Sequence, residues 1–119
     1  MGQQLSTFEK NYAKFNDTKH CIGVGNGLDA LILSLKALNI GAGDEVIVPS
    51  NTYIASWLAV SYTGATIVPV EPNIDTYNID PNLIEEKITS KTKAIMPVNL
   101  YGQACELDKI MAIAKKHNL

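Results

Sequence analysis

The sequence contains no arginine, and its ten lysines are scattered along the chain in ones and twos. Without a basic face that could collect phosphates, the chain does not resemble a nucleic-acid-binding protein. Its apolar runs are all far shorter than the roughly 20 residues of a membrane-spanning helix, so no membrane span is expected. The opening residues show no leader pattern of a basic, an apolar and a small-residue part, which gives secretion no support.

Cysteine is also scarce: Cys21 and Cys105 lie far apart and outside any metal-ligand spacing. This favours a reduced, cytoplasmic protein over a disulfide framework, and no metal site is expected. The rest of the composition is ordinary, with 46% hydrophobic residues, 18% charged residues and a net charge of -2. Such values are typical of a globular chain rather than a disordered one, and 119 residues are enough for one domain.

Short apolar, β-branched runs alternate with segments of helical periodicity. The runs predict strands at residues 20–24, 45–48, 66–70 and 93–98, and the periodic segments predict helices at 28–38, 54–62, 81–88 and 106–117. Phe8, Tyr12 and Phe15 mark a further helix before the first strand. Strands with few polar positions, separated by helices, predict an α/β fold, a three-layer αβα arrangement around a mainly parallel sheet. Pro69 removes a ladder donor, which suggests that the strand at 66–70 lies at an edge or ends there.

The pattern stops where a parallel α/β protein would continue. A parallel unit runs strand, helix, strand, whereas no strand follows the last predicted helix. We therefore interpret residues 1–119 as a fragment of a longer protein. Residues 73–78, the longest stretch without a pattern, are interpreted as a surface loop.

A glycine-rich turn, residues 23–30, joins the first predicted strand to the helix at 28–38. Glycines let backbone N–H groups approach a ligand closely, and a helix start adds unpaired donors and partial positive charge, so a phosphate would fit. A dinucleotide-binding fingerprint would need glycine where Leu28 stands, and a Walker loop would need Gly-Lys-Ser/Thr, which is absent. A tight turn without a ligand is the remaining alternative.

Two more polar turns follow predicted strands, at residues 49–54 and 99–103. Ligands of open α/β sheets gather beyond the carboxyl ends of the strands. Tyr53 in the first of these turns could stack on a planar ring, or it could be half buried and close the top of the core. Three such turns at one edge of a sheet predict a ligand site there.

Six motifs, in this order and spacing, resemble the DegT/DnrJ/EryC1/StrS family of pyridoxal-phosphate-dependent nucleotide-sugar aminotransferases. They are Gly-Asn-Gly-Leu-Asp-Ala-Leu at 25–31, Gly-Ala-Gly-Asp-Glu-Val-Ile-Val-Pro-Ser at 41–50, Thr-Tyr-Ile-Ala-Ser at 52–56, Gly-Ala-Thr at 64–66, Asn-Ile-Asp-Pro at 78–81 and Leu-Tyr-Gly-Gln at 100–103. The resemblance covers nearly the whole chain, but only about the opening third of the family's usual length. It implies that residues 1–119 are a fragment of the large, cofactor-binding domain of a fold-type-I aminotransferase. The remainder of that domain and the small C-terminal domain would then be absent.

The resemblance places the cofactor's phosphate at Asn26, Gly27 and Leu28, held by backbone N–H groups and by the Asn26 side chain. The family often has Ser-Gly-Thr here; Leu28 has no hydroxyl, so only its backbone can serve. The aromatic residue that stacks on the cofactor ring corresponds to Tyr53.

Three further residues, Asn99, Tyr101 and Gln103, fall near the family's active site without a defined role. Asn99 stands where many members have His, so its contribution stays open.

The resemblance also implies what residues 1–119 do not contain. The family's Schiff-base lysine and the carboxylate that pairs with the cofactor's pyridine nitrogen correspond to positions beyond residue 119. A Schiff-base lysine must point into a desolvated pocket, whereas the ten lysines here fall on solvated helix faces or beside strand starts. We therefore expect no catalytic residue within the chain.

For the whole protein, the resemblance implies transfer of an amino group from an amino acid, with glutamate expected, to a nucleotide-linked keto sugar. The residues at 25–31, 52–54 and 69–72 resemble those of family members that act on 3-keto sugars, which favours a dTDP-linked 3-keto-6-deoxyhexose as the substrate. The family further implies a homodimer. The alternatives are a 4-keto sugar aminotransferase, a pyridoxal-phosphate-dependent sugar dehydratase, and a non-catalytic remnant that binds the cofactor or a sugar.

Several other residues are interpreted as structural. Cys21 is expected to be buried inside a strand, Trp57 to lie in the core or a subunit interface, and Glu85 and Glu86 to be solvated. His117 suits a favourable charge in the last turn of a helix. Asp29 is expected to be a hydrogen-bond partner at a helix start and to point away from a bound phosphate.

Overall fold

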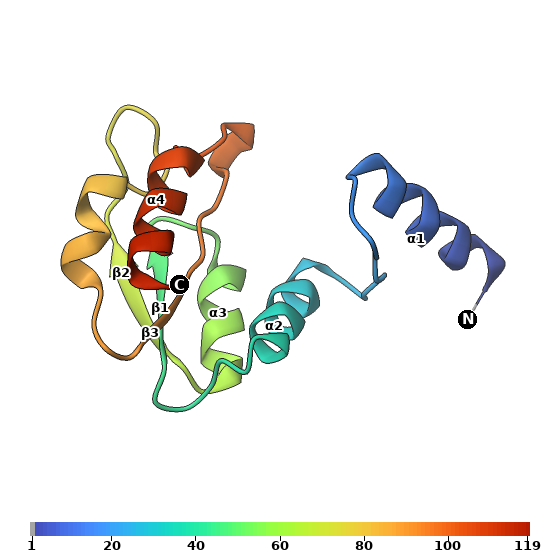
Figure 1. Cartoon of the computed structure of the whole chain (residues 1–119), viewed down its shortest axis with the longest axis horizontal. Helices are drawn as coiled ribbons and strands as arrows, with labels where there is room; N and C mark the ends of the chain where they lie inside the picture. Colours follow the sequence, from blue (N-terminus) through green and yellow to red (C-terminus); the bar gives the residue numbers. More distant parts are fainter. Residues whose placement is uncertain (1) are drawn as a thin grey trace.

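A three-stranded parallel sheet forms the centre of the protein, seen in a computed structural model that describes residues 2–119 (Figure 1). Its strands are β1 (Glu45–Pro49), β2 (Thr66–Val70) and β3 (Thr92–Ile95), in the order β2-β1-β3. In register, Val46 lies opposite Ile67 on one side and Ala94 on the other. Within the described residues β2 is an edge strand, as Pro69 suggested.

Alternate residues of β1 point into two apolar cores, one on each face of the sheet, because successive side chains of a strand point to opposite faces. Val46 and Val48 join a core built with α2 (Gly27–Ala37) and α3 (Ile54–Thr63). Ile47 joins the other core, to which α4 (Leu107–His117) contributes Ile110. Helices thus cover both faces, which confirms the predicted α/β class and its three layers.

The second face is completed by two short 3-10 turns, η1 (Pro81–Leu83) and η2 (Glu85–Lys87), where the sequence predicted one helix over 81–88. Here the backbone bonds run from i to i+3, as in Leu83 N–H to Asp80 O and Lys87 N–H to Ile84 O. An α-helix of eight residues is marginal without strong packing. The tighter turns still bury Ile84 completely.

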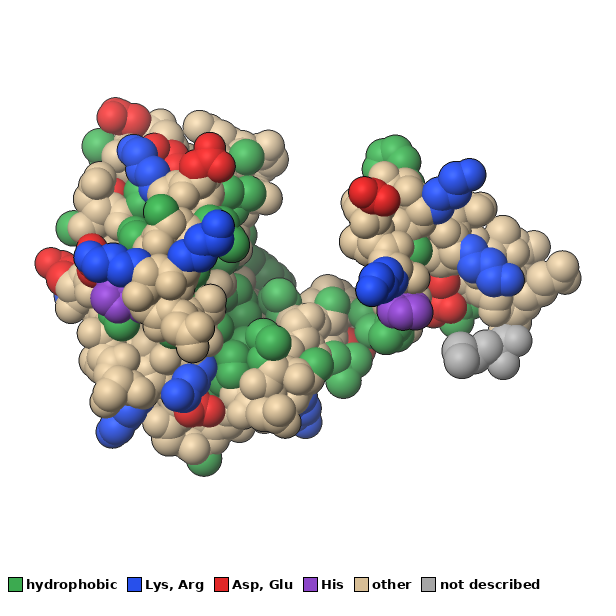
Figure 2. All heavy atoms as spheres, in the orientation of Figure 1, with side chains coloured by type: hydrophobic (Ala, Val, Ile, Leu, Met, Phe, Trp, Pro, Cys, Tyr) green, Lys and Arg blue, Asp and Glu red, His purple; other side chains and the backbone are tan. Residues whose placement is uncertain are grey.

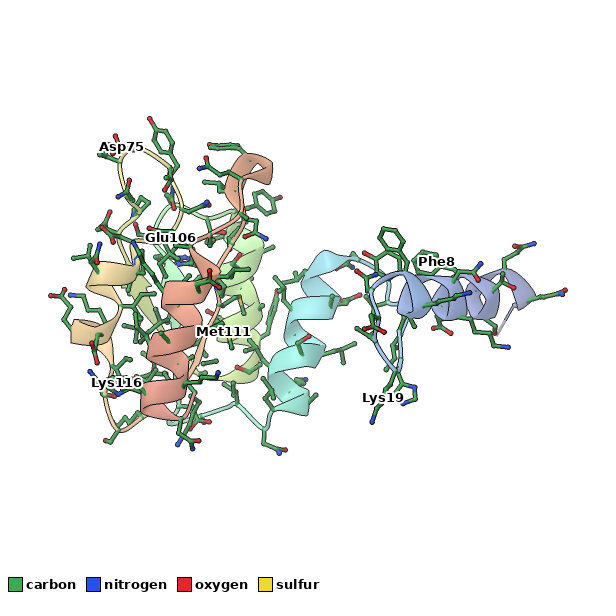
Figure 3. All side chains as sticks on the ribbon, turned by 45° about the horizontal axis from the view of Figure 1, so that its top comes forward. Phe8, Lys19, Asp75, Glu106, Met111 and Lys116 are labelled. Carbon is green, nitrogen blue, oxygen red and sulfur yellow. The ribbon has the colours of Figure 1, made fainter. Side chains whose placement is uncertain are left out.

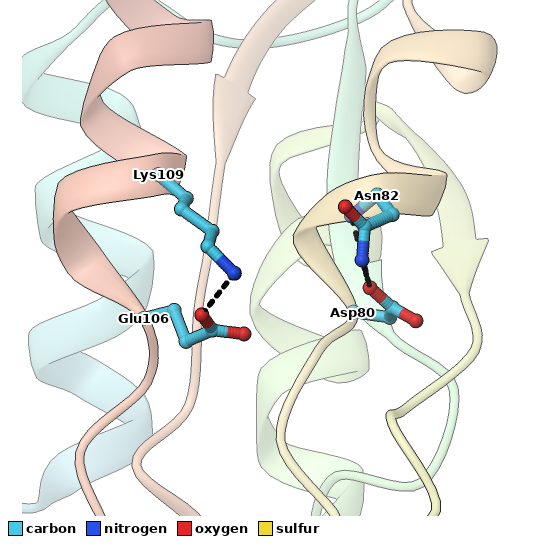
Figure 4. A network of polar contacts seen from close by, with 4 residues as sticks. All are labelled: Asp80, Asn82, Glu106 and Lys109. Carbon is cyan, nitrogen blue, oxygen red and sulfur yellow. Dashed lines mark hydrogen bonds and ion pairs between the residues drawn. The ribbon is translucent and has the colours of Figure 1, made fainter.

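Polar side-chain contacts lie at the starts of η1 and α4 (Figure 4). Asp80 Oδ1 accepts hydrogen bonds from the Asn82 backbone N–H and side-chain amide, both at 2.9 Å, and so begins η1. At the start of α4, Lys109 forms an ion pair with Glu106.

One predicted strand is wrong: residues 20–24 have an irregular backbone. A strand needs a hydrogen-bonded neighbour, and within residues 2–119 no strand pairs with this segment. Instead, Gly23 N–H donates to Glu9 Oε1 of α1 (Gln3–Phe15) at 2.8 Å. Cys21 is therefore neither in a strand nor fully buried.

Helix α1 lies apart from the sheet and is joined to it only through residues 16–26 and α2 (Figure 1). The helix itself was predicted, but its aromatic residues contact mainly one another. The rings of Phe8 and Tyr12 stack with centroids 5.4 Å apart, and Phe15 is 85% exposed. No helix among residues 2–119 is long and apolar enough to span a membrane.

Candidate functional site

Two of the three polar turns predicted from the sequence, at 49–54 and 99–103, follow strands of one parallel sheet, whereas the glycine-rich turn at 23–30 follows no strand. Residues 50–53 follow β1, residues 71–80 follow β2, and residues 96–106 follow β3. Because parallel strands end at the same edge, these three segments gather on one side of the sheet. Figure 3 shows Asp75 at the tip of the segment after β2, on the same side as Glu106 at the start of α4.

The glycine-rich turn leads into α2, as predicted, and Asn26 is the N-cap of that helix. Asn26 Oδ1 accepts a hydrogen bond from the Asp29 backbone N–H at 2.9 Å, and its Nδ2 donates to Asp29 Oδ2 at 3.0 Å. The backbone N–H groups of Gly27 and Leu28 belong to the first turn of the helix, where no intrahelical acceptor exists. Together with the positive end of the helix dipole, they form a site suited to an anion.

The space around Gly27 fits a close ligand. A Cβ atom added there would have no neighbour within 4 Å, whereas one added at Gly25 would lie 2.9 Å from Asp29 Oδ2. A side chain at Gly27 would thus extend into open space, while one at Gly25 would meet the Asp29 carboxylate. The residues present fit a phosphate group bound by backbone N–H groups.

Asp29 is the hydrogen-bond partner that the sequence predicted. Its carboxylate turns back onto Asn26 and Gly25 rather than standing clear of the turn. The Asn26 side chain is therefore engaged in capping, and only its second amide hydrogen is left for a ligand. The direction of Asp29 relative to a bound phosphate stays a prediction.

Tyr53 lies just before α3, at the N-cap position, and is 77% exposed. Within residues 2–119 the ring is therefore exposed rather than half-buried over the core. The turn behind it is fixed: Thr52 and Ser56 share a hydrogen bond of 2.9 Å, and Trp57 Nε1 donates to Pro49 O at 3.1 Å. The Tyr53 ring is thus exposed on a turn that these two hydrogen bonds hold, and it is available to stack on a planar ligand.

The turn after β3 contains a short 3-10 segment, η3 (Leu100–Gly102), in which Tyr101 is 88% exposed. It is tied to the segment after β2 by Asn78, which the sequence had placed at the end of a surface loop. Asn78 is instead 3% exposed and hydrogen-bonded through its side chain to that turn. Asn78 opens the motif at 78–81, but nothing in that motif indicated this contact, since asparagine is common in turns of every kind.

All ten lysines are exposed, as their positions in the sequence predicted. Glu85 and Glu86 are exposed as well, but Glu85 is paired, accepting from Lys116 Nζ at 2.5 Å and His117 Nε2 at 2.7 Å. Hydrogen bonds from Lys116 and then His117 lower the pKa of the Glu85 carboxyl. This cluster joins η2 to the end of α4, away from the strand ends, and gives His117 a structural partner.

Cys105 is buried, and its Sγ donates to Val98 O at 3.1 Å. Burial raises the pKa of this thiol, which keeps it neutral rather than nucleophilic.

An apolar groove of about 530 Å³ lies elsewhere, between α4 and the segment before β1 (Figure 2). Leu38, Ile40 and Met111 line it, and apolar side chains dominate this part of the surface. Asp44 and Lys93 border the groove at the amino ends of the strands, and Pro97 and Leu107 border it beyond the carboxyl end of β3. Its lining is mainly apolar, and it meets the segment after β3 at Pro97.

A family model, the DegT/DnrJ/EryC1/StrS aminotransferase family, matches residues 1–119. The chain belongs to this family. It is 63% identical over 119 residues to the dTDP-3-amino-3,6-dideoxy-alpha-D-galactopyranose transaminase of Aneurinibacillus thermoaerophilus, covering 100% of this chain and 33% of that protein. It is 53% identical to the dTDP-3-amino-3,4,6-trideoxy-alpha-D-glucose transaminase of Streptomyces venezuelae, covering 100% of this chain and 31% of that one. The chain thus spans about a third of the length of these relatives.

The fold matches solved members as well. The crystal structure of NtdA from Bacillus subtilis, with bound cofactor PMP, superposes with a TM-score of 0.97 at 39% identity. The match covers 100% of this chain and 27% of that one. The parallel sheet flanked by helices is therefore part of the fold of this aminotransferase family.

Proposed function

We propose that residues 1–119 form the first part of the cofactor-binding large domain of a nucleotide-sugar aminotransferase. Support comes from the family match over the whole chain and from relatives named as sugar transaminases. In this proposal the remainder of the large domain and a small C-terminal domain belong to the full-length protein, which assembles as a cytoplasmic homodimer.

The observation that carries the proposal is the open helix start at Gly27. Backbone N–H groups of Gly27 and Leu28, with the cap residue Asn26, would hold the phosphate of pyridoxal phosphate, and the exposed ring of Tyr53 would stack on its pyridine ring. When bound, this cofactor supplies the electron sink for moving an amino group between an amino acid and a keto sugar. The chain's own residues bind and orient it.

The nucleophilic lysine and the carboxylate for the pyridine nitrogen would come from beyond residue 119. A lysine of this kind needs a desolvated pocket that lowers its pKa, and all ten lysines of the chain are exposed. Residues 1–119 alone would therefore be inactive, because they would form part of the cofactor-binding site but lack the nucleophilic lysine.

For the substrate we propose a dTDP-linked 3-keto-6-deoxyhexose, with glutamate as the amino donor. Two relatives that match the entire chain are named as transaminases of dTDP-3-amino sugars. The turn that binds the phosphate would set the position of the cofactor relative to the sugar. Because reacting atoms tolerate misplacement of only about 1 Å, a small shift of the cofactor is one physical basis for a preference between C3 and C4.

To test this, the full-length protein is assayed with glutamate and with matched 3-keto and 4-keto dTDP-sugars, and the two values of kcat/KM are compared. We expect preference for the 3-keto sugar. Preference for the 4-keto sugar would contradict the regiochemistry and leave the aminotransferase intact. Loss of water from the sugar without amination would indicate the dehydratase alternative, and no turnover with bound cofactor would indicate the non-catalytic remnant.

A further inference from the structure

Tyr101 holds an unusual backbone conformation for a large exposed residue. Its φ is 55° and its ψ 22°, in the left-handed region, and its side chain is 88% exposed. A Cβ-bearing residue is strained in this region, and an exposed ring gains little from packing within the chain. The surrounding structure must therefore hold the turn in place.

Asn78 does so from the segment after β2. Its Oδ1 accepts from the Leu100 backbone N–H, and its Nδ2 donates to Gln103 O, both at 3.0 Å. These two bonds bracket Tyr101 and Gly102. Because Asn78 is 3% exposed, water does not compete with the bonds, and both ends of its amide have partners.

A second asparagine joins this turn to the one that carries Tyr53. Asn51 Nδ2 donates to Tyr77 O at 2.9 Å, and Tyr77 directly precedes Asn78. Tyr77 is also left-handed, with a φ of 58°. Two asparagine side chains thus connect the segments after all three strands, with exposed Tyr53 at one end of the series and exposed Tyr101 at the other.

We propose that Asn78 is a positioning residue for the sugar substrate. It fixes the turn at 100–103, so that the Tyr101 ring lies at the carboxyl edge of the sheet, where it would contact one side of the bound nucleotide sugar. The inference rests on the proposed function and extends it. A rigid aromatic ring suits the apolar face of a hexose or a planar base, and fixing it beforehand removes the cost of ordering the turn on binding.

The test uses the full-length protein and the variant Asn78→Asp. Aspartate keeps the shape and can still accept from Leu100 N–H, but it cannot donate to Gln103 O and repels it. Asn11→Asp is the control, because it makes the same charge change at an exposed asparagine of α1. We expect KM for a dTDP-linked 3-keto-6-deoxyhexose to rise at least tenfold in Asn78→Asp. We expect kcat and the Kd of pyridoxal phosphate to stay within twofold, and Asn11→Asp to match the wild type.

A measurement independent of activity follows the turn itself. Chymotrypsin cleaves after tyrosine, so mass spectrometry reports cleavage after Tyr101 and after the exposed Tyr53 in the same sample. We expect at least tenfold faster cleavage after Tyr101 in Asn78→Asp, with cleavage after Tyr53 unchanged. Equal rates in Asn78→Asp and wild type would contradict the role of Asn78 in holding the turn.

Tyr101→Gly separates a substrate role from a merely structural one. Glycine removes the ring and relieves the left-handed strain, so we expect a higher Tm together with at least a tenfold higher KM. An unchanged KM in both Tyr101→Gly and Asn78→Asp would overturn the proposal. A rise in the Kd of pyridoxal phosphate as large as the rise in KM would overturn it as well. A change of dimer dissociation with unchanged KM would assign the ring to a contact between copies and also overturn it. A wild type that aminates neither keto sugar would refute the proposed function, and this inference with it.

Discussion

Gly27 is the residue on which the proposed phosphate site depends most directly. At its neighbours in the glycine-rich turn a side chain would have to displace the end of another side chain: a Cβ at Gly23 would lie 2.5 Å from Leu5 Cδ1, and one at Gly25 would lie 2.9 Å from Asp29 Oδ2. At Gly27 no protein atom explains the absence of a side chain. The approach of a ligand would explain it.

Replacing Gly27 with valine should therefore weaken cofactor binding without unfolding the protein. In the full-length protein we expect Gly27→Val to raise the Kd of pyridoxal phosphate at least tenfold, a loss of about 1.4 kcal/mol. Absorbance titration measures the Kd. Gly2→Val is the matched control, since Gly2 precedes α1 and a Cβ there also meets nothing within 4 Å. Unchanged affinity in folded Gly27→Val would mean that the turn is only structural.

At Tyr53 the ring should matter more than the hydroxyl. The ring is exposed, and stacking on a pyridine ring needs only the π system. In the full-length protein we expect Tyr53→Phe to keep the cofactor Kd and Tyr53→Ala to weaken binding by roughly 1 kcal/mol. The same titration measures both. If phenylalanine were as damaging as alanine, the hydroxyl would carry the role and stacking would be the wrong account.

At the scale of elements, most of the fold could be predicted because each strand and helix carries its own pattern. Val46, Ile47 and Val48 form a β-branched run buried on both faces, and such a run indicates a central parallel strand without other information. Residues 20–24 carry a similar run, yet the structure has no strand there. A strand also requires a neighbour at the right place, and that depends on the rest of the chain rather than on the run.

The candidate site divides in the same way. The positions of Asn26, Gly27 and Leu28 at the start of α2 and of Tyr53 just before α3 could be predicted from local patterns, while their roles stay predictions. Asn78 could not, because its contacts with Leu100 and Gln103 join positions more than 20 residues apart through the tertiary fold.

The contact between η2 and α4 should depend on pH. Lys116 and His117 lower the pKa of Glu85 below its ordinary value of 4.5. The stabilisation is therefore complete above this ordinary value and is lost as the pH falls through the lowered one. Glu86 and Lys87 are the other charges beside it on η2.

Urea unfolding of the chain across a pH series measures this effect. We expect Glu85→Gln to be less stable than wild type at neutral pH, with the difference shrinking as the pH falls below 4.5. Glu86→Gln removes the same charge from the adjacent residue, whose ion-pair partner is Lys87. Its free energy of unfolding should differ less from that of the wild type. A constant difference for Glu85→Gln down to strongly acidic pH would refute the electrostatic contact.

For the whole molecule, the main question is what residues 1–119 can do by themselves. The two cores pack on both faces of β1, so the sheet and its helices form a continuous body. Tyr53 and Tyr101 are exposed in the segments that follow β1 and β3, and the start of α2 is capped by Asn26. Every lysine is exposed. In the proposed division of the active site, these residues therefore bind the cofactor and the lysine that bonds to it covalently lies beyond residue 119.

This separation predicts the outcome of reductive labelling. The 119-residue chain, mixed with pyridoxal phosphate and reduced with borohydride, should show only low labelling spread over many lysines, because burial activates none of the ten above the others. Peptide mass spectrometry locates the labels. The full-length protein treated in parallel should carry one dominant label beyond residue 119. A single, stoichiometric label within residues 1–119 that disappears when that lysine is changed to arginine would place the nucleophile in this segment, and the proposed division of the active site would then be wrong.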